Sequence, residues 1–173
     1  KGVMLTHRNQ VSNFYHTSLK FKYNEWKNYL HAGPMFHLAD CGKSVGVTWA
    51  GAAHSFIKTF TTRGFLEAVQ EYRPNVISLI PTMINMVMND PDFEKYCVSS
   101  IQKISYGASP MQTDLLKRVA QAFPGVEFYQ AYGMTEASPV LTILEPKDHV
   151  IGGNDMEEKR LSSVGQCAPG VEV

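Results

Sequence analysis

The feature that most constrains the fold of this 173-residue chain is a repeated alternation of short β-branched runs with longer segments of helical spacing. The clearest run, 75–80, is continuous and rich in β-branched residues, and Pro81 stops it and can begin a helix. The same order returns as a strand at 102–106, a helix at 111–123 and a strand at 126–131. Strands that alternate with helices predict an α/β fold, with a mostly parallel sheet and helices on both faces.

The first half of the chain carries the same alternation with weaker signals. Thr6 stands where an N-cap would begin a helix, and the residues after it have helical spacing. The other elements expected in this half are a strand at 29–32 stopped by Gly33-Pro34, a helix at 38–50, a strand at 53–60, and helices at 64–72 and 81–88.

The pattern changes after Leu144. A polar segment with paired glycines follows and predicts a loop, and 163–173 predicts the start of a further β element. We therefore divide the chain into an α/β subdomain at 1–145 and a loop with a truncated β element at 146–173. The chain begins with Lys1 rather than Met, which suggests a start partway through a gene product.

Charge and cysteine content indicate which partners and which cellular compartment to expect. Sixteen basic and sixteen acidic side chains cancel, so no overall field favours nucleic acid or a membrane surface. No apolar stretch approaches the roughly 20 residues of a membrane-spanning helix. The three cysteines are widely spaced and form no CxxC motif, which favours a reducing compartment and predicts a cytoplasmic protein.

Ligands of a parallel α/β sheet gather beyond the carboxyl ends of its strands. After the strand at 126–131 comes Tyr132-Gly133-Met134-Thr135-Glu136. Its aromatic ring can stack on a base, its hydroxyl can bind a phosphate oxygen, and its carboxylate can hold Mg²⁺. The same residues also fit a strand-to-helix turn in which Thr135 or Ser138 is the N-cap. The residues alone leave both interpretations open.

Three other places are also open to a functional and a structural interpretation. Gly107-Ala108-Ser109 consists of small residues that let a planar ligand approach the backbone, although Ser109 can equally cap the next helix. His37 can meet a substrate carboxylate or serve a structural role, and it lacks the neighbours of a metal site. Lys1-Gly2 can end a phosphate-binding loop or be a solvated basic end.

Six tags in one order carry a family resemblance: KGVMLTHRN, PMFH, IPTM, YGASPM, QAYGMTE and SVGQ-x-x-PG. Together they resemble the adenylate-forming, AMP-binding superfamily over essentially the whole chain. This superfamily includes acyl-CoA and aryl-CoA synthetases, luciferases and peptide-synthetase adenylation domains. The resemblance implies a central subdomain of the large N-terminal domain of such an enzyme.

The resemblance also implies roles for single residues. Thr135 would contact the α-phosphate and Glu136 would position Mg²⁺, both as catalytic groups, while His37 and Gly107 would lie beside the acid substrate. The residues that would bind the nucleotide are Lys1, Gly107, Ala108, Ser109, Gln130, Ala131, Tyr132, Gly133, Met134 and Thr135.

The reaction implied is that of an AMP-forming acid–thiol ligase, which uses ATP, Mg²⁺, a carboxylic acid and CoA. Phe36-His37 in place of a Phe-Asp pair favours fatty or aryl acids, and YGASPM with QAYGMTEASPV is closest to bacterial fatty-acyl-CoA synthetases. An aryl-acid ligase and a non-catalytic nucleotide- or acyl-binding module are the alternatives.

The family also uses a ribose-binding Asp, a hinge and a lysine-bearing C-terminal domain, which do not fit within 173 residues. We therefore expect the chain alone to be inactive, and to self-associate through the face that the missing part would cover.

Overall fold

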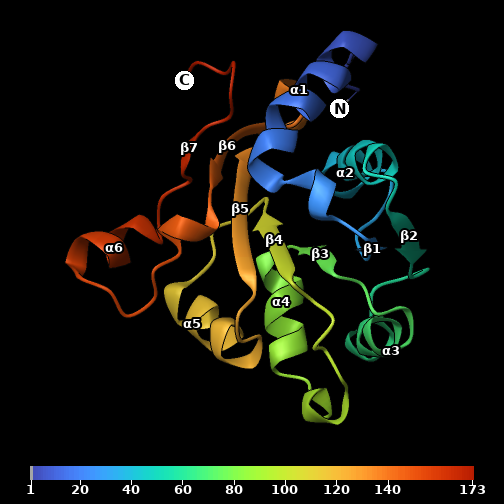
Figure 1. Ribbon diagram of the computed structural model, residues 1–173, viewed down its shortest axis with the longest axis vertical. Coiled ribbons are helices and arrows are strands. Elements are labelled where there is room, and N and C mark those ends of the chain that lie inside the picture. Colours follow the sequence, from blue (N-terminus) through green and yellow to red (C-terminus); the bar gives the residue numbers. More distant parts are fainter. Residues whose placement is uncertain (1) are drawn as a thin grey trace.

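The computed structural model describes residues 2–173, and Lys1 lies outside the described residues. A seven-stranded sheet of order β2-β1-β3-β4-β5-β6-β7 forms its centre (Figure 1). The first five strands run parallel and the last two pairings are antiparallel. The strands are β1 (Asn28–His31), β2 (Ala53–Phe56), β3 (Val76–Leu79), β4 (Lys103–Gly107), β5 (Glu127–Gly133), β6 (Val140–Leu144) and β7 (Gln166–Cys167). The predicted α/β fold with a mostly parallel sheet is confirmed.

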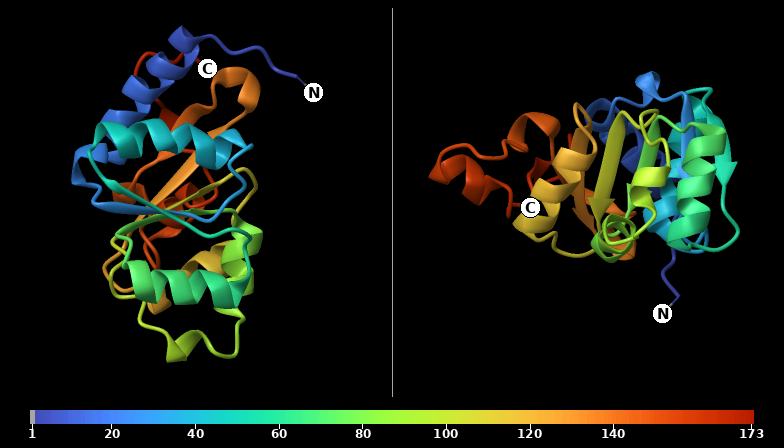
Figure 2. Two further views of the ribbon diagram at one scale, coloured as in Figure 1. Left: turned by 90° about the vertical axis from the view of Figure 1, so that its right-hand side faces the viewer. Right: turned by 90° about the horizontal axis from the view of Figure 1, so that it is seen from below.

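Helices cover both faces of this sheet, as the side views in Figure 2 show. One layer holds α1 (His7–Phe21) and α2 (Leu38–Trp49). The other holds α3 (Thr62–Tyr72), α4 (Pro81–Met88) and α5 (Thr113–Ala122). A short helix, α6 (Asp155–Arg160), lies beyond the sheet on the β7 side.

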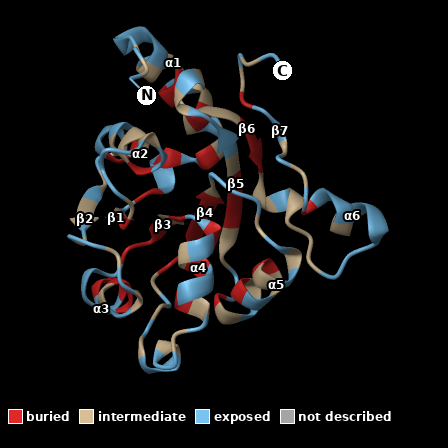
Figure 3. Ribbon diagram, turned by 180° about the vertical axis from the view of Figure 1, so that it is seen from behind, coloured by how far each residue is buried: buried red, intermediate tan, exposed pale blue. Residues whose placement is uncertain are grey.

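Strand alternation divides the core into two apolar clusters. Successive side chains of a strand point to opposite faces, so Tyr29 packs with α1 and α2 while Leu30 packs with α3 and α4. Both side chains are fully buried, and the central strands are rich in buried residues, as Figure 3 shows. The burial of both faces explains why the strand segments read as continuous apolar runs.

Local chemistry accounts for where the helices begin. The Thr6 hydroxyl accepts from the backbone N–H of Asn9, whose side chain accepts in return from the Thr6 N–H, so a complete capping box starts α1. Thr61 caps α3 through the N–H of Gly64 at 3.0 Å. Pro81 occupies the first turn of α4, as expected.

Several expectations about single elements are wrong. The strand expected at 53–60 ends at Phe56, because Phe56 pairs with His31, the last residue of β1, and β1 is the only described neighbour of this edge strand. Ser109 does not cap α5, whose N-cap position is Gln112. Neither Thr135 nor Ser138 caps a helix, because 135–137 forms one 3₁₀ turn and Ser138 follows it with a φ of 73°.

The segment after Leu144 is more ordered than the sequence suggested. A capping box between Asn154 and Glu157 starts α6 inside the expected loop. The expected β element forms as β7, which pairs with β6 through Ile143 and Gln166 and so joins the same sheet as the first part of the chain. The division at 145/146 stays a proposal. Over residues 2–173, none of the helices has both the length and the apolar composition needed to cross a membrane.

Candidate functional site

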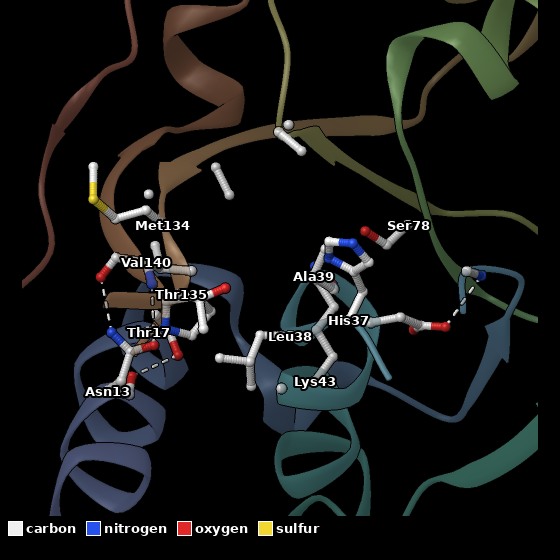
Figure 4. A pocket seen from close by; sticks show the side chains of 18 of the residues that line it. Asn13, Thr17, His37, Leu38, Ala39, Lys43, Ser78, Met134, Thr135 and Val140 are labelled. Carbon is white, nitrogen blue, oxygen red and sulfur yellow. Dashed lines mark hydrogen bonds between the residues drawn. The ribbon is translucent and has the colours of Figure 1, made fainter. Parts of the chain in front are cut away.

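A cavity of about 610 Å³ opens beyond the carboxyl ends of β1, β3, β4 and β5. Its walls come from α1 and α2, from the start of α4, and from the segment that joins β5 to β6. In Figure 4 the labelled residues of α1 and of the β5–β6 segment lie across the cavity from those of α2. The position matches the crevice in which parallel α/β sheets hold ligands, and the volume is that of a small-molecule site.

The ends of β4 and β5 form the floor of this cavity with almost no side-chain bulk. A Cβ atom at Gly107 would collide with the carbonyl oxygen of Ala131, and one at Gly133 would collide with the carbonyl oxygen of Pro139. Ala108 follows Gly107 with a φ of 65°, a left-handed conformation that alanine rarely adopts. Close backbone packing therefore requires glycine at both positions, and both residues line the cavity.

The turn after β5 brings polar side chains to the rim. The N–H of Met134 donates to the Pro139 carbonyl at 2.9 Å, which closes the turn between β5 and β6. Thr135 and Glu136 line the cavity from this closed turn, and Glu136 is exposed to solvent. Tyr132 is 43% exposed, so its ring face is available for stacking on a planar ligand.

Helix α1 is fixed to the same turn by one side-chain amide. Asn13 Nδ2 donates to the Val140 carbonyl at 2.8 Å, and its Oδ1 accepts from the Val140 N–H at 3.4 Å. The Asn13 amide thus bonds both backbone polar groups of Val140, as a neighbouring strand would, and holds α1 against the start of β6. Asn13 was not predicted from the sequence. A polar amide on the inward face of an amphipathic helix is the signal that could have identified it.

A buried carboxylate anchors the start of α2. Asp40 Oδ1 accepts from the Tyr29 hydroxyl at 2.8 Å and from His31 Nδ1 at 3.0 Å, while Oδ2 accepts from the Gly33 N–H at 3.1 Å. Burial, and next the Asp40 charge, raise the pKa of Tyr29 well above its usual value. The loop that carries His37 is thereby fixed to β1.

This hydrogen-bond chain continues to the surface through a second histidine. His31 Nε2 lies 2.9 Å from His54 Nδ1, and His54 Nε2 lies 3.1 Å from the Thr48 hydroxyl. Because His31 Nδ1 donates to a carboxylate, its Nε2 accepts from His54 in the neutral pair, and Thr48 donates to His54. Burial and the neighbouring His31 lower the pKa of His54.

A protein-family model described as AMP-binding enzyme matches residues 1–173. This chain belongs to the AMP-binding enzyme family. Among curated relatives it is 30% identical to 4-coumarate–CoA ligase 1 of Petroselinum crispum, over 83% of this chain and 27% of that ligase. It is 29% identical to the putative acyl-CoA synthetase YngI of Bacillus subtilis, over 100% of this chain and 30% of that protein.

Solved structures agree on the AMP-binding fold. The N-terminal domain of FACL13 from Mycobacterium tuberculosis superposes with a TM-score of 0.84 at 21% identity, over 98% of this chain and 40% of that one. The O-succinylbenzoate CoA synthetase of B. subtilis, solved with ATP and a magnesium ion, gives 0.79 at 24% identity, over 98% and 33%. Aryl and acyl relatives match at nearly equal identity, and the chain spans about a third or less of the curated relatives' length.

Most of the site residues predicted for an AMP-binding chain converge on the cavity. Its lining includes His37, Gly107, Ala108, Ala131, Tyr132, Gly133, Met134, Thr135 and Glu136. Ser109 is exposed just outside it, and Gln130 is buried in β5 behind it, 3.5 Å from the Tyr106 hydroxyl. Lys1 lies outside the described residues. The roles of all these residues stay predictions.

The metal prediction can be compared with the donors present. Within residues 2–173 no three His, Cys, Asp or Glu side chains gather as a metal cluster. Mg²⁺ commonly keeps several waters and is held by one or two carboxylates together with substrate phosphates. The single exposed carboxylate of Glu136 at the cavity rim fits that type of site.

Proposed function

We propose that the protein containing this chain is an ATP-dependent, AMP-forming acid–thiol ligase that activates a carboxylic acid and transfers it to CoA. The observation that carries the proposal is the convergence of the Gly107-Ala108 floor and the Thr135-Glu136 turn on one cavity with an otherwise largely apolar wall. A polar rim beside an apolar space suits a nucleotide that reacts with the carboxylate of an apolar acid.

Each end of the cavity would hold one part of the reacting pair. Tyr132 would stack on the adenine, and Gly107 and Gly133 would let the nucleotide lie against the backbone. Thr135 would donate to the α-phosphate, and Glu136 would hold Mg²⁺ through its carboxylate. When bound, this ion would neutralise phosphate charge.

The reaction would proceed in two displacements. An oxygen of the substrate carboxylate forms a bond to the α-phosphorus as the bond to pyrophosphate breaks. The thiolate sulfur of CoA then bonds to the acyl carbon, and AMP leaves. The residues described here would contribute mainly to the first step, by orienting the carboxylate in line with the leaving group and by stabilising charge.

The acid is proposed to be a fatty acid, with an aryl acid as the alternative. The space beyond His37 is walled by apolar side chains from both helices and from α4, among them Phe14, Leu38 and Met83. Such walls suit an alkyl chain or a ring equally, and the relatives include both 4-coumarate–CoA ligases and acyl-CoA synthetases. The free cysteines support the proposed cytoplasmic location.

The test is pyrophosphate release by the full-length protein with ATP and Mg²⁺, using octanoate and 4-coumarate as acids. We expect release to depend on the acid and to require all three components. Glu136→Gln should lower kcat by about 10²-fold, the order observed when one group that stabilises a transition state is removed. Glu94→Gln is the matched control, because Glu94 is exposed on a distant 3₁₀ turn.

The outcomes separate the candidates. Preference for one acid decides between the fatty-acyl and aryl readings. ATP binding without acid-dependent pyrophosphate release would contradict the ligase proposal and indicate a non-catalytic binding module. The 173-residue chain by itself is expected to bind nucleotide weakly and to release no pyrophosphate, because it spans about a third or less of its relatives' length.

A further inference from the structure

One lysine lies in the wall of the cavity away from the proposed phosphate-binding turn. Lys43 is on α2 and is the only Lys or Arg among the described residues that line the cavity. Its neighbours there include Phe21, whose ring centroid is 5.9 Å from Nζ, and Ala39. Figure 4 places it with His37 and Ala39, across the cavity from Thr17.

The Lys43 ammonium has only one hydrogen-bond acceptor within residues 2–173. Nζ donates to the Ala39 carbonyl of its own helix at 3.0 Å. Lys43 is not among the described lysines that form ion pairs, which are Lys20, Lys22, Lys95, Lys103, Lys117 and Lys147. An ammonium carries three donors, so two N–H groups of Lys43 are left for a ligand or water.

Asp40, the acidic residue of the same helix, forms no ion pair with Lys43 among the described residues. Both oxygens of Asp40 are occupied by Tyr29, His31 and the Gly33 N–H, and no ion pair joins it to Lys43 in the part of the chain that the structure describes. Burial lowers the pKa of Lys43 to about 8, although the Asp40 charge opposes this shift. The amine is therefore mostly protonated at neutral pH, and no carboxylate within residues 2–173 forms an ion pair with it.

Lys43 lies further along α2 than His37, toward the part of the cavity that Phe21 lines. This helix connects two parallel strands, β1 and β2, so it runs from their carboxyl edge back toward their amino edge. The backbones of His37 and Lys43 are six positions apart, about 9 Å along the helix axis. The Lys43 side chain reaches back from there to the Ala39 carbonyl. Phe21 and Tyr23, which share this end of the cavity, come from the last turn of α1 and the segment after it.

We propose that Lys43 determines substrate specificity by binding a second carboxylate, at the end of the acid remote from the one that is activated. The inference rests on the proposed function and names the substrate class, a dicarboxylic acid. A second carboxylate in this cavity would accept the two free N–H groups and neutralise a partly desolvated cation. A plain alkyl acid of the same length would leave that cation without a partner beside its methyl end.

The experiment compares octanoate with octanedioate, which have equal chain length and differ only at the far end. Pyrophosphate release by the full-length protein is measured with each acid, for the unmodified protein and for Lys43→Met, which keeps the length of the side chain and removes its charge. Lys58→Met is the control, because Lys58 is exposed on the loop after β2.

We expect the unmodified protein to favour octanedioate. Lys43→Met should raise KM for octanedioate by about 10- to 100-fold, the range of a lost charged hydrogen bond, with a smaller change in kcat. KM for octanoate should stay level or fall, which also shows that the variant is folded. Lys43→Arg should keep part of the preference, and the control should keep all of it.

A second measurement does not depend on a variant. The kcat/KM of the unmodified protein for octanedioate, relative to octanoate, should fall as the pH rises above about 8, where free Lys43 loses its proton. The protein could instead release pyrophosphate with both acids and show a preference between them that changes neither in Lys43→Met nor with pH. That result would overturn the inference and leave the ligase proposal standing. Absence of release with octanoate, octanedioate and 4-coumarate alike would instead overturn the proposed function and this inference with it.

Discussion

At the scale of single residues, His149 couples stability to pH. Its Nδ1 donates to the Glu145 carbonyl and its Nε2 accepts from the Tyr106 hydroxyl, each at 2.9 Å, so the ring is held neutral. Burial lowers the pKa of His149, opposed by the hydrogen bond to Glu145 and the charge of Asp148. The unfolded chain therefore takes up this proton more readily, and stability present above about pH 6.5 is lost as the pH falls.

We expect the free energy of unfolding, measured by urea titration, to decrease between pH 7 and pH 5. His149→Gln should make this decrease shallower, because glutamine can still accept from Tyr106 and does not titrate. His7→Gln, at an exposed position, is the control. An unchanged pH slope in His149→Gln would show that this histidine does not carry the effect.

Some residues of the cavity could be predicted from the sequence and others could not. Residues such as Gly107 and Thr135 follow directly after a strand, so a local rule places them at the ligand-binding edge. Asn13 reaches the site through Val140, which is 127 positions away along the chain. Lys43 enters only because α2 packs beside α1. No local pattern contains such a pairing, which is why both residues were missed.

At the scale of elements, the contact between α2 and Tyr23 gives a packing prediction. A Cβ atom at Gly46 would lie 2.6 Å from a ring carbon of Tyr23, a buried side chain. Gly46→Ala should therefore destabilise the fold by up to about 2 kcal/mol, which is the overpacking cost of about 1–3 kcal/mol less about 1 kcal/mol of gained helix propensity.

Gly42 on the same helix supplies the control. A Cβ atom there would meet Pro139 at 3.7 Å, an ordinary contact, so Gly42→Ala should leave stability level or raise it by up to about 1 kcal/mol. Thermal unfolding of both variants measures the difference. Equal stability of the two would mean that Tyr23 moves aside without cost.

Elements with a periodic apolar signal were predicted well, and two without one were missed. The six residues of α6 have no apolar face, and only the Asn154 to Glu157 capping box marks its start. β6 is a short apolar run that begins directly after the Thr135–Ala137 turn and Pro139. From the sequence this region is interpreted as a turn or ligand site, and no strand is predicted after it. Its antiparallel direction depends on β5, so it cannot be read from the strand itself.

At the scale of the whole molecule, an exposed apolar face lies on the two helices of one layer. Val11, Tyr15 and Leu19 follow one another at four-residue spacing on α1 and are 47%, 58% and 74% exposed. Val45 and Trp49 add to them from α2, and Trp49 packs edge-on against Phe14 of α1. A continuous apolar face of this kind favours association, and we propose that the 173-residue chain forms dimers or larger species through it.

Light scattering over a rising concentration series tests this association. The apparent mass should increase with concentration, and Leu19→Glu with Tyr15→Lys should shift the increase to higher concentration by placing charges in the contact. Met156→Glu is the matched control, because Met156 is 67% exposed on α6, away from this face. A monomer at every concentration would contradict the prediction. Association that the α1 variants leave unchanged would assign the contact to another surface, such as the open sheet edges at β2 and β7.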